Sequence, residues 1–232
     1  MKLIRRRLPD TVGALALTVA AAFCIAGSPA VSQRAHAQES APEATVDVKA
    51  LMDQSVLPDI ALGKADAPVT IVEYASMTCS HCAAFHAGTW PALKKDFIET
   101  GKVRFIFRAF PLDPVATAAT MLMRCAPQDK YYDMVDLFFD NQKDWAFVQD
   151  PLSGLLSMAK QAGFTQMSFE ACLSNQKLLD QINTVKETAY KQFGVNATPT
   201  FFLNGQKLTG EQSIDAFAKA IDAAAAKAGP AN

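Results

Sequence analysis

Two apolar runs in the first half of the chain are typical of buried strands. Residues 69–74 and 103–107 are rich in β-branched and aromatic side chains and are bounded by turn-forming residues. The segment between them, residues 81–99, is mostly helix-forming, although Gly88 and Pro91 predict a kink or break within it. A strand, a helix and a strand within about forty residues match the spacing of a βαβ unit, so we expect parallel strands.

The second half of the chain has a different period. From residue 115 to about residue 193, apolar residues recur at every third or fourth position in several stretches, which predicts a helical insertion. Residues 199–203 and 207–209 have the pattern of two short strands, and Asn204-Gly205 between them predicts a type I′ turn. An alanine-rich helix over residues 213–228 is expected to close the chain.

The N-terminal segment, residues 1–37, differs from the rest. Basic residues up to Arg7 precede an apolar run over 12–27, and Ala35-His36-Ala37 is a small-x-small cleavage site. This pattern is typical of a cleaved secretory signal peptide. The alternative is an uncut membrane anchor, but the run is shorter than the roughly 18 apolar residues that a spanning helix needs. Residues 38–58 are then expected to be a flexible mature N-terminus.

Composition limits the class of protein. The chain has 232 residues, half of them apolar, which is enough for one sizeable core with a helical part attached. Residues 1–37 hold five basic residues and one acidic residue, so their removal leaves 17 basic against 22 acidic side chains, a net charge of −5. Neither this value nor the −1 of the whole chain gives an electrostatic reason to propose nucleic acid as a partner.

Four cysteines remain after cleavage at Ala37: Cys79, Cys82, Cys125 and Cys172. Export places them in an oxidising compartment, where disulfides persist. Cys79 and Cys82 are separated by two residues, and a local pair there leaves Cys125 to bond Cys172. A structural disulfide closing that loop would stabilise the fold by about 4 kcal/mol in the chain-entropy model. The alternative is that Cys125 and Cys172 are two buried free thiols.

The pair Cys79 and Cys82 has a metal alternative. His86 lies four residues past Cys82 and could face the same side of a helix as part of a zinc site, but a fourth ligand is missing nearby. A c-type haem site needs histidine directly after the second cysteine, where Ala83 stands. We therefore expect no metal and no cofactor.

The spacing of the cysteines favours thiol-disulfide exchange. With Thr78 as the helix N-cap, Cys79 would face unpaired backbone N–H groups and the positive end of the helix dipole, which should lower its thiol pKa. Cys82, one turn further on, would be shielded. Cys79 would then exchange with a substrate and Cys82 would resolve the mixed disulfide, with the His81 ring donating to the Cys79 thiolate. His86 is interpreted as an ordinary residue.

Three stretches carry a resemblance to a known family. Residues 73–82 (Glu-Tyr-Ala-Ser-Met-Thr-Cys-Ser-His-Cys) resemble the active-site stretch of the DsbA-type thioredoxin-fold oxidoreductases. The similarity continues in residues 107–112, in the helical insertion and in residues 194–200, and covers nearly all of residues 59–226.

The resemblance implies an α/β protein with a thioredoxin fold and an inserted helical domain. Residues 59–114 and 194–232 would form the two parts of the thioredoxin-like domain, and residues 115–193 the insert.

Specific site residues follow from the same resemblance. Pro199 would be a cis-proline beside the active site that contacts substrate backbone together with Thr198. Glu73 would lie beneath the helix, shuttling protons or tuning Cys82, although an ordinary charged residue at a strand end is an equal alternative. Ser80, which is expected to modulate the active site together with His81 and Glu73, replaces a proline of the best-known DsbA pattern, and Thr198 replaces a valine. The resemblance therefore does not determine the redox potential.

The leading hypothesis is a monomeric periplasmic oxidase. It would donate a Cys79-Cys82 disulfide to newly exported proteins that are reduced or misfolded, and a membrane partner resembling DsbB would reoxidise it. The alternatives are a disulfide isomerase or reductase of the same fold, mildly suggested by Thr198, and a non-catalytic peptide-binding chaperone module. Isomerases of this fold tend to carry an oligomerisation domain first, and few residues precede the first strand here.

Overall fold

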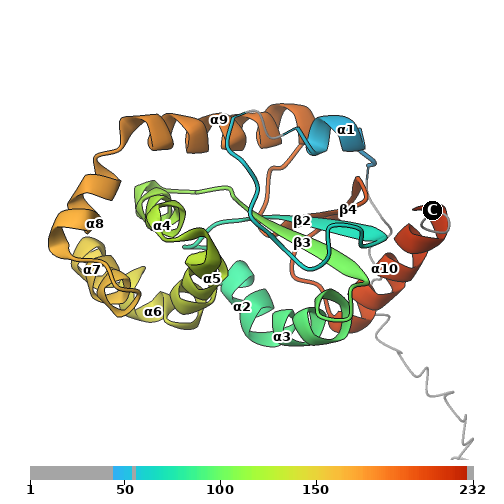
Figure 1. Cartoon of the computed structure of the whole chain (residues 1–232), viewed down its shortest axis with the longest axis horizontal. Helices are drawn as coiled ribbons and strands as arrows, with labels where there is room; N and C mark the ends of the chain where they lie inside the picture. Colours follow the sequence, from blue (N-terminus) through green and yellow to red (C-terminus); the bar gives the residue numbers. More distant parts are fainter. Residues whose placement is uncertain (1–43, 54–55, 229–232) are drawn as a thin grey trace, which may run out of the picture. The chain divides into compact units, whose positions relative to one another are not determined.

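The computed structural model describes residues 44–53 and 56–228. The expected signal peptide and the first residues of the expected flexible segment lie outside these residues. The described chain contains one mixed sheet with the strand order β1-β3-β2-β4-β5 (Figure 1). The strands are β1 (Ala61–Leu62), β2 (Val69–Ala75), β3 (Val103–Ala109), β4 (Thr200–Leu203) and β5 (Gln206–Thr209).

The pairing of the strands confirms the expected βαβ unit and hairpin. β2 and β3 are parallel along their whole length, from the pair Val69 and Val103 onwards, while β4 is antiparallel to both β2 and β5. Asn204 and Gly205 both have positive φ, 45° and 86°, as a type I′ turn requires. Gly205 is also required by space, because a Cβ there would lie 2.7 Å from the Val46 carbonyl oxygen.

The helix expected over residues 81–99 forms in three pieces. α2 ends at Gly88, α3 follows with Pro91 in its first turn, where a missing N–H removes no hydrogen bond, and a π-helical segment ends the run. The break expected at Gly88 and Pro91 is therefore confirmed. The pieces are α2 (Ser80–Gly88), α3 (Trp90–Leu93) and η1 (Lys94–Ile98).

The chain between β3 and β4 is helical, as its periodicity predicts. Figure 1 shows α4 to α8 grouped beside one end of the sheet, with the long α9 returning along one face. The helices are α4 (Pro114–Cys125), η2 (Gln128–Lys130), α5 (Tyr131–Asp140), α6 (Gln142–Trp145), α7 (Pro151–Gln161), α8 (Gln166–Leu173) and α9 (Gln176–Phe193), and α10 (Ile214–Ala228) follows the hairpin.

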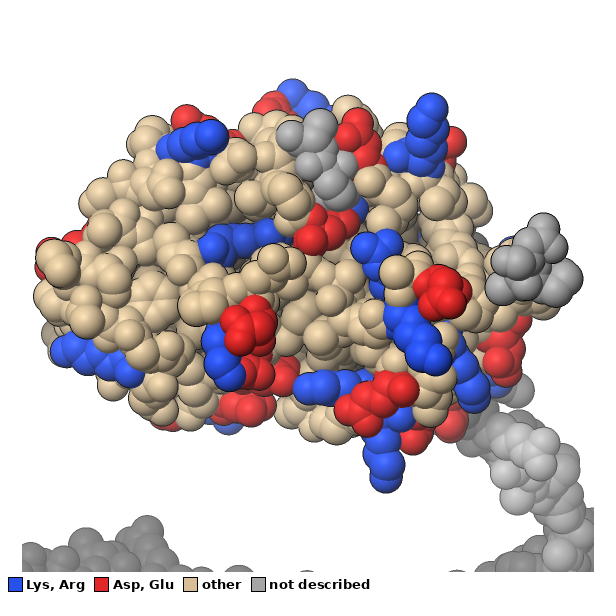
Figure 2. All heavy atoms as spheres, viewed as in Figure 1, with Lys and Arg blue, Asp and Glu red and all other residues tan. Residues whose placement is uncertain are grey.

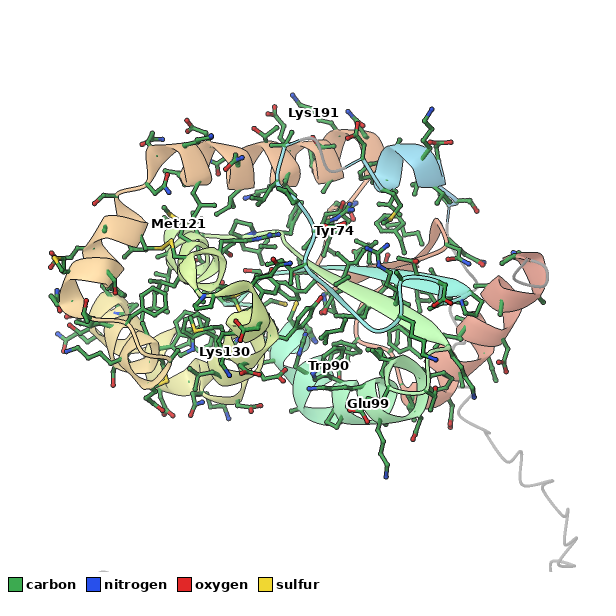
Figure 3. All side chains as sticks on the ribbon, in the orientation of Figure 1. Tyr74, Trp90, Glu99, Met121, Lys130 and Lys191 are labelled. Atoms are coloured by element: carbon green, nitrogen blue, oxygen red, sulfur yellow. A yellow bond between two sulfur atoms is a disulfide. The ribbon has the colours of Figure 1, made fainter. Side chains whose placement is uncertain are left out.

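The two faces of the sheet bury separate apolar clusters, because side chains alternate along each strand. Val69, Ile71 and Ala75 of β2 belong to a large cluster that also includes residues of α2, α3, α10 and the inserted helices. Val72 and Tyr74 belong to a smaller cluster beneath α1 and α9. Figure 3 shows this separation: Trp90 and Tyr74 lie on opposite sides of the sheet.

A segment expected to be flexible is partly ordered. The helix α1 (Val48–Leu51) buries Leu51, and Val46 donates its N–H to the Gly205 carbonyl at 2.9 Å. A buried ion pair fixes the chain further on, since Arg108 of β3 donates two hydrogen bonds, of 2.9 and 2.8 Å, to the carboxylate of Asp59. The pattern of apolar residues does not predict these two contacts, because each joins residues that are far apart in the sequence.

Over residues 44–53 and 56–228, none of the helices combines the length and the apolar character needed to cross a bilayer. On the face in Figure 2, acidic and basic side chains are interspersed and no large area carries a single sign.

Candidate active site

Cys79 lies at the point where the chain after β2 turns into α2. It is the N-cap residue, with extended backbone angles, and its carbonyl accepts the first hydrogen bond of the helix from Ala83 at 3.1 Å. The expectation that Thr78 is the N-cap is therefore wrong by one residue. The Thr78 hydroxyl instead donates to the carboxylate of Asp113, a stronger acceptor than a neutral oxygen.

The Cys79 sulfur is held in surroundings that favour the thiolate. The residue is 9% exposed, and its thiol donates to the Thr198 carbonyl at 3.3 Å. The Cys82 thiol contributes most to lowering the Cys79 pKa, to about 5. The Thr198 side chain and the backbone N–H groups of Cys82 and His81 lower this pKa further, while partial burial opposes the shift. The first turn of the helix thus supplies the donors expected for a reactive cysteine.

Cys82 has the opposite character. It is completely buried on the inner face of α2. Burial raises the pKa of the Cys82 thiol well above its ordinary value, and the neighbouring Cys79 and the negative charge of Glu73 raise it further. The two thiols of one short motif are therefore strongly unequal, and both are free in this structure.

Glu73 and His86 form a buried pair beneath the cysteines. The Glu73 side chain is completely buried in β2, and the His86 Nε2 atom lies 3.1 Å from its Oε2 atom. Glu73 is therefore not an ordinary charged residue at a strand end. His86, interpreted from the sequence as an ordinary residue, is turned inward by α2, one turn after Cys82, and its ring stacks on Phe139.

His81 and Ser80 occupy the outer side of α2. The His81 ring is largely exposed, and its Nδ1 atom lies 3.8 Å from the Glu211 carboxylate. The expected donation from this ring to Cys79 is not found in this structure, where the His81 backbone N–H stabilises the thiolate instead. Ser80 begins the helix and is exposed.

Thr198 and Pro199 lie beside Cys79 although they are far away in the sequence. The peptide bond between them is cis, as the resemblance implies. The hydrogen bond from Cys79 to the Thr198 carbonyl places this loop next to the reactive sulfur, and β4 begins directly after it.

Sequence reasoning missed two residues that hold the active-site loop. The Gln142 side-chain amide, buried at the start of α6, donates to the carbonyls of Met77 at 2.8 Å and Cys79 at 3.0 Å. Asp113 caps α4 through the Ala116 N–H at 2.8 Å while accepting from Thr78. An aspartate before Pro114 is a recognisable N-cap signal, but Gln142 carries no signal in the sequence.

Cys125 at the end of α4 and Cys172 in α8 are joined by a disulfide, with Cα atoms 6.0 Å apart. Among the side chains of residues 44–53 and 56–228, no three of histidine, cysteine, aspartate or glutamate are placed to hold a metal ion together. In particular, His86 contacts Glu73, which gives it a partner other than a metal.

The fold and the site together define a thioredoxin-fold protein with a reactive dithiol at a helix N-terminus. A family model described as thioredoxin matches residues 55–223. A Rickettsia typhi protein whose name describes a protein-disulfide oxidoreductase is 30% identical over 167 residues, 72% of this chain and 62% of that protein.

Solved structures give the same result. Wolbachia pipientis alpha-DsbA1 is 33% identical with a TM-score of 0.69, covering 73% of this chain and 92% of that one. BdbD of Bacillus subtilis, at 22% identity and a TM-score of 0.66, covers 80% of this chain and 98% of its own and shares the fold. The chain therefore belongs to the thioredoxin family, in its DsbA-like group. It spans about three fifths of the length of the rickettsial relatives it matches, 62% and 60% for two of them.

Proposed function

We propose that the protein is an exported thiol-disulfide oxidoreductase, acting as an oxidase that donates a Cys79-Cys82 disulfide to other proteins. The observation that carries the proposal is the inequality of the two sulfurs. Cys79 keeps 9% of its surface exposed and has a thiol pKa lowered to about 5, whereas Cys82 is completely buried and its pKa is raised. A stable thiolate makes Cys79 a good leaving group, which makes the reduced form favourable and the disulfide a strong oxidant.

The exchange proceeds in two displacements. A client thiolate attacks the Cys79 sulfur, the client-Cys79 bond forms, and the Cys79-Cys82 bond breaks with Cys82 taking the electron pair and a proton. A second client thiolate then attacks the client sulfur of the mixed disulfide and displaces Cys79 as a thiolate. The client loses two electrons and gains a disulfide, and the enzyme ends as the dithiol.

Client contacts are proposed for the surface around Cys79. Thr198 and Pro199 are candidates for contacting client backbone because their loop lies against the reactive sulfur. A surface hollow of about 540 Å³, lined by residues that include Leu112 and Met121, is connected to the site through Asp113, which lines it and bonds Thr78. Leu112 is 52% exposed, as expected of a surface that binds apolar segments of unfolded clients.

Location and partners belong to the same proposal. The sequence of residues 1–37 and the Cys125-Cys172 disulfide both favour the periplasm. A membrane partner resembling DsbB would reoxidise the dithiol, and the protein would act as a monomer on reduced or misfolded exported proteins.

The redox potential tests the direction of the reaction. Reference values are about −270 mV for thioredoxin and about −120 mV for DsbA, which are properties of those proteins and not of this chain. We expect equilibration with glutathione to give a value near the second, and the disulfide form to oxidise a reduced unfolded protein. A potential near that of thioredoxin would rule out the oxidase. The Cys82→Ser variant should accumulate mixed disulfides through Cys79.

A disulfide isomerase or reductase is the second candidate, favoured by Thr198 beside the reactive sulfur. It would reshuffle a scrambled disulfide protein faster than it oxidises a reduced one. A non-catalytic peptide-binding module is the third alternative. The pH dependence of Cys79 alkylation in the reduced protein distinguishes this module from an oxidoreductase. An unshifted Cys79 pKa would support the binding module.

A further inference from the structure

Glu73 carries a carboxylate in an unusual position, the middle of the central strand. On the flanking strands its register partners are Phe107 of β3 and Phe201 of β4, and its side chain is completely buried. One oxygen, Oε2, contacts His86. The other oxygen, Oε1, is buried and has no hydrogen-bond partner within the described residues.

His86 is enclosed by aromatic rings. The Phe139 ring stacks on it with centroids 4.2 Å apart and planes at 24°, and Trp90, Phe85 and Phe107 contact it at 5.2 to 6.1 Å between centroids. Nε2 has the single polar contact with Glu73, and Nδ1 is buried and unpartnered within the described residues. A histidine that served only to fill space could be any aromatic residue here.

Several titratable groups face this pair. Cys82 lies on the same face of α2, one helical turn before His86, and the negative charge of Glu73 acts on its sulfur. From α5, Asp136 accepts a hydrogen bond from the Trp90 indole at 2.9 Å, and the charge of His86 acts to lower its pKa. The negative charge of Glu73 acts to raise the pKa of the Tyr131 and Tyr132 hydroxyls. Lys94 approaches Asp136 at 3.8 Å on the solvent side.

We propose that His86 is a positioning residue for thiol-disulfide exchange, whose Nε2–H holds Glu73 as the carboxylate that takes the proton of Cys82. The inference rests on the proposed function and assigns a role that the motif itself does not contain. When Cys82 attacks the Cys79 sulfur of a mixed disulfide, the Cys82 proton moves to Glu73 Oε1. The Cys79-Cys82 bond forms, the bond from Cys79 to the other thiol breaks, and that thiol leaves with the electron pair. In the oxidase direction, Glu73 returns the proton to Cys82.

The physical reason is the cost of an unpaired buried charge. A carboxyl group surrounded by phenylalanine side chains keeps its proton unless a donor stabilises the charged form. With its proton on Nε2, the His86 ring is the donor that contacts Oε2 of Glu73 at 3.1 Å. A carboxyl that keeps its own proton cannot accept one from Cys82. General-base catalysis typically contributes about 10²- to 10⁴-fold, so loss of the His86 donor should cost at least about tenfold in the rate of the Cys82 attack.

The test follows that attack in a single turnover. Reduced protein is mixed with oxidised glutathione, whereupon Cys79 forms a mixed disulfide and releases one glutathione, and Cys82 then releases the second. Acid quenching and mass spectrometry give the rate of each step between pH 5 and 9. His86→Phe keeps the stacked ring and removes the donor, whereas His86→Gln keeps an N–H. Phe139→Leu is the matched control, since it disturbs the same packing and leaves the donor in place.

We expect His86→Phe to accumulate the mixed disulfide and to resolve it at least about tenfold more slowly at pH 7. The rate of the Cys82 attack in this variant should keep rising to higher pH, because it then depends on the fraction of Cys82 present as thiolate. His86→Gln should regain most of the rate, and Phe139→Leu should keep the wild-type pH profile. Three results would each overturn the inference. The His86→Phe variant could resolve the mixed disulfide at the wild-type rate, the Phe139→Leu variant could show the same altered pH profile as His86→Phe, or His86→Gln could be as slow as His86→Phe. If His86→Phe loses the native circular dichroism spectrum, Glu73→Gln replaces it with the same expected slowing. Failure of the proposed function gives different results: without thiol-disulfide exchange, wild-type protein would form no mixed disulfide, and with only the oxidase direction wrong, its glutathione potential would lie near that of thioredoxin.

Discussion

The stability of the reduced protein should depend on pH in a way that the oxidised protein does not share. Folding lowers the Cys79 pKa to about 5 in the reduced form, whereas an unfolded cysteine titrates near about 8.5. A folded-state pKa below the unfolded value stabilises the fold fully above the unfolded pKa, and this contribution disappears as the pH falls through the folded pKa. The oxidised form has no thiol at this position and lacks the contribution.

The magnitude follows from proton linkage. Between about pH 6 and pH 8, the unfolded thiol keeps its proton and the folded one has lost it, so the unfolding free energy of the reduced form should rise relative to the oxidised form by up to about 1.4 kcal/mol per pH unit. Cys79 is partly exposed to solvent, and screening by solvent reduces the total over this range to about 1–2 kcal/mol. Burial raises the pKa of Cys82, so Cys82 opposes the trend only above about pH 8.5.

Guanidinium unfolding of both redox forms at several pH values measures this difference. The disulfide also restrains the unfolded chain, but that effect adds a constant, and only the slope with pH is diagnostic. The Cys79→Ser variant, reduced, should lose the slope. A difference between the redox forms that stays flat from pH 6 to pH 8 would refute the assignment of Cys79 as a thiolate.

Three further predictions concern the groups around the site. Gln142→Leu should lower the unfolding free energy by about 1–3 kcal/mol and raise the Cys79 pKa measured by iodoacetamide alkylation, because two loop carbonyls lose their donor; an unchanged alkylation profile would contradict this. Arg108→Met should cost about 3–5 kcal/mol in denaturant unfolding, since it leaves the buried Asp59 carboxylate unpaired, and adding Asp59→Asn should recover part of the loss. Cys125→Ser with Cys172→Ser should lower stability by about 2–4 kcal/mol with the glutathione potential unchanged; a shifted potential would assign this disulfide more than a structural role.

The sheet and its connections could be predicted because local patterns determine them. The run over residues 69–74 is apolar on both sides of the strand, as a central strand covered on two faces requires, and Asn204-Gly205 determines the hairpin turn through its positive φ angles. Helix α1 and strand β1 were not predicted, since four and two residues give no period to read. They are held by contacts with Gly205 and Arg108, which are distant in the chain.

The candidate site divides in the same way. The lowered pKa of the Cys79 thiol agrees with the position at the start of a helix that the sequence predicts, where the Cys82 thiol and backbone N–H groups lie close to the sulfur. The prediction placed the His81 ring beside Cys79, whereas the structure leaves that ring exposed and turns His86 inward, because the direction of each ring depends on which face of α2 packs against the sheet. Gln142 could not be found at all, since only tertiary packing brings it to the loop.

The anchoring of this loop by Gln142 and Asp113 limits how the protein can be re-engineered. Gln142 belongs to the insertion and Asp113 caps α4, with which the insertion begins, so a designer who transplants the Cys79-Cys82 tetrapeptide into a minimal thioredoxin scaffold transfers the sulfurs without their supports. A chimera that exchanges the helical part for another would have to keep the beginnings of α4 and α6. The insertion is thus a structural component of the reactive turn as well as a neighbour of the surface that clients would meet.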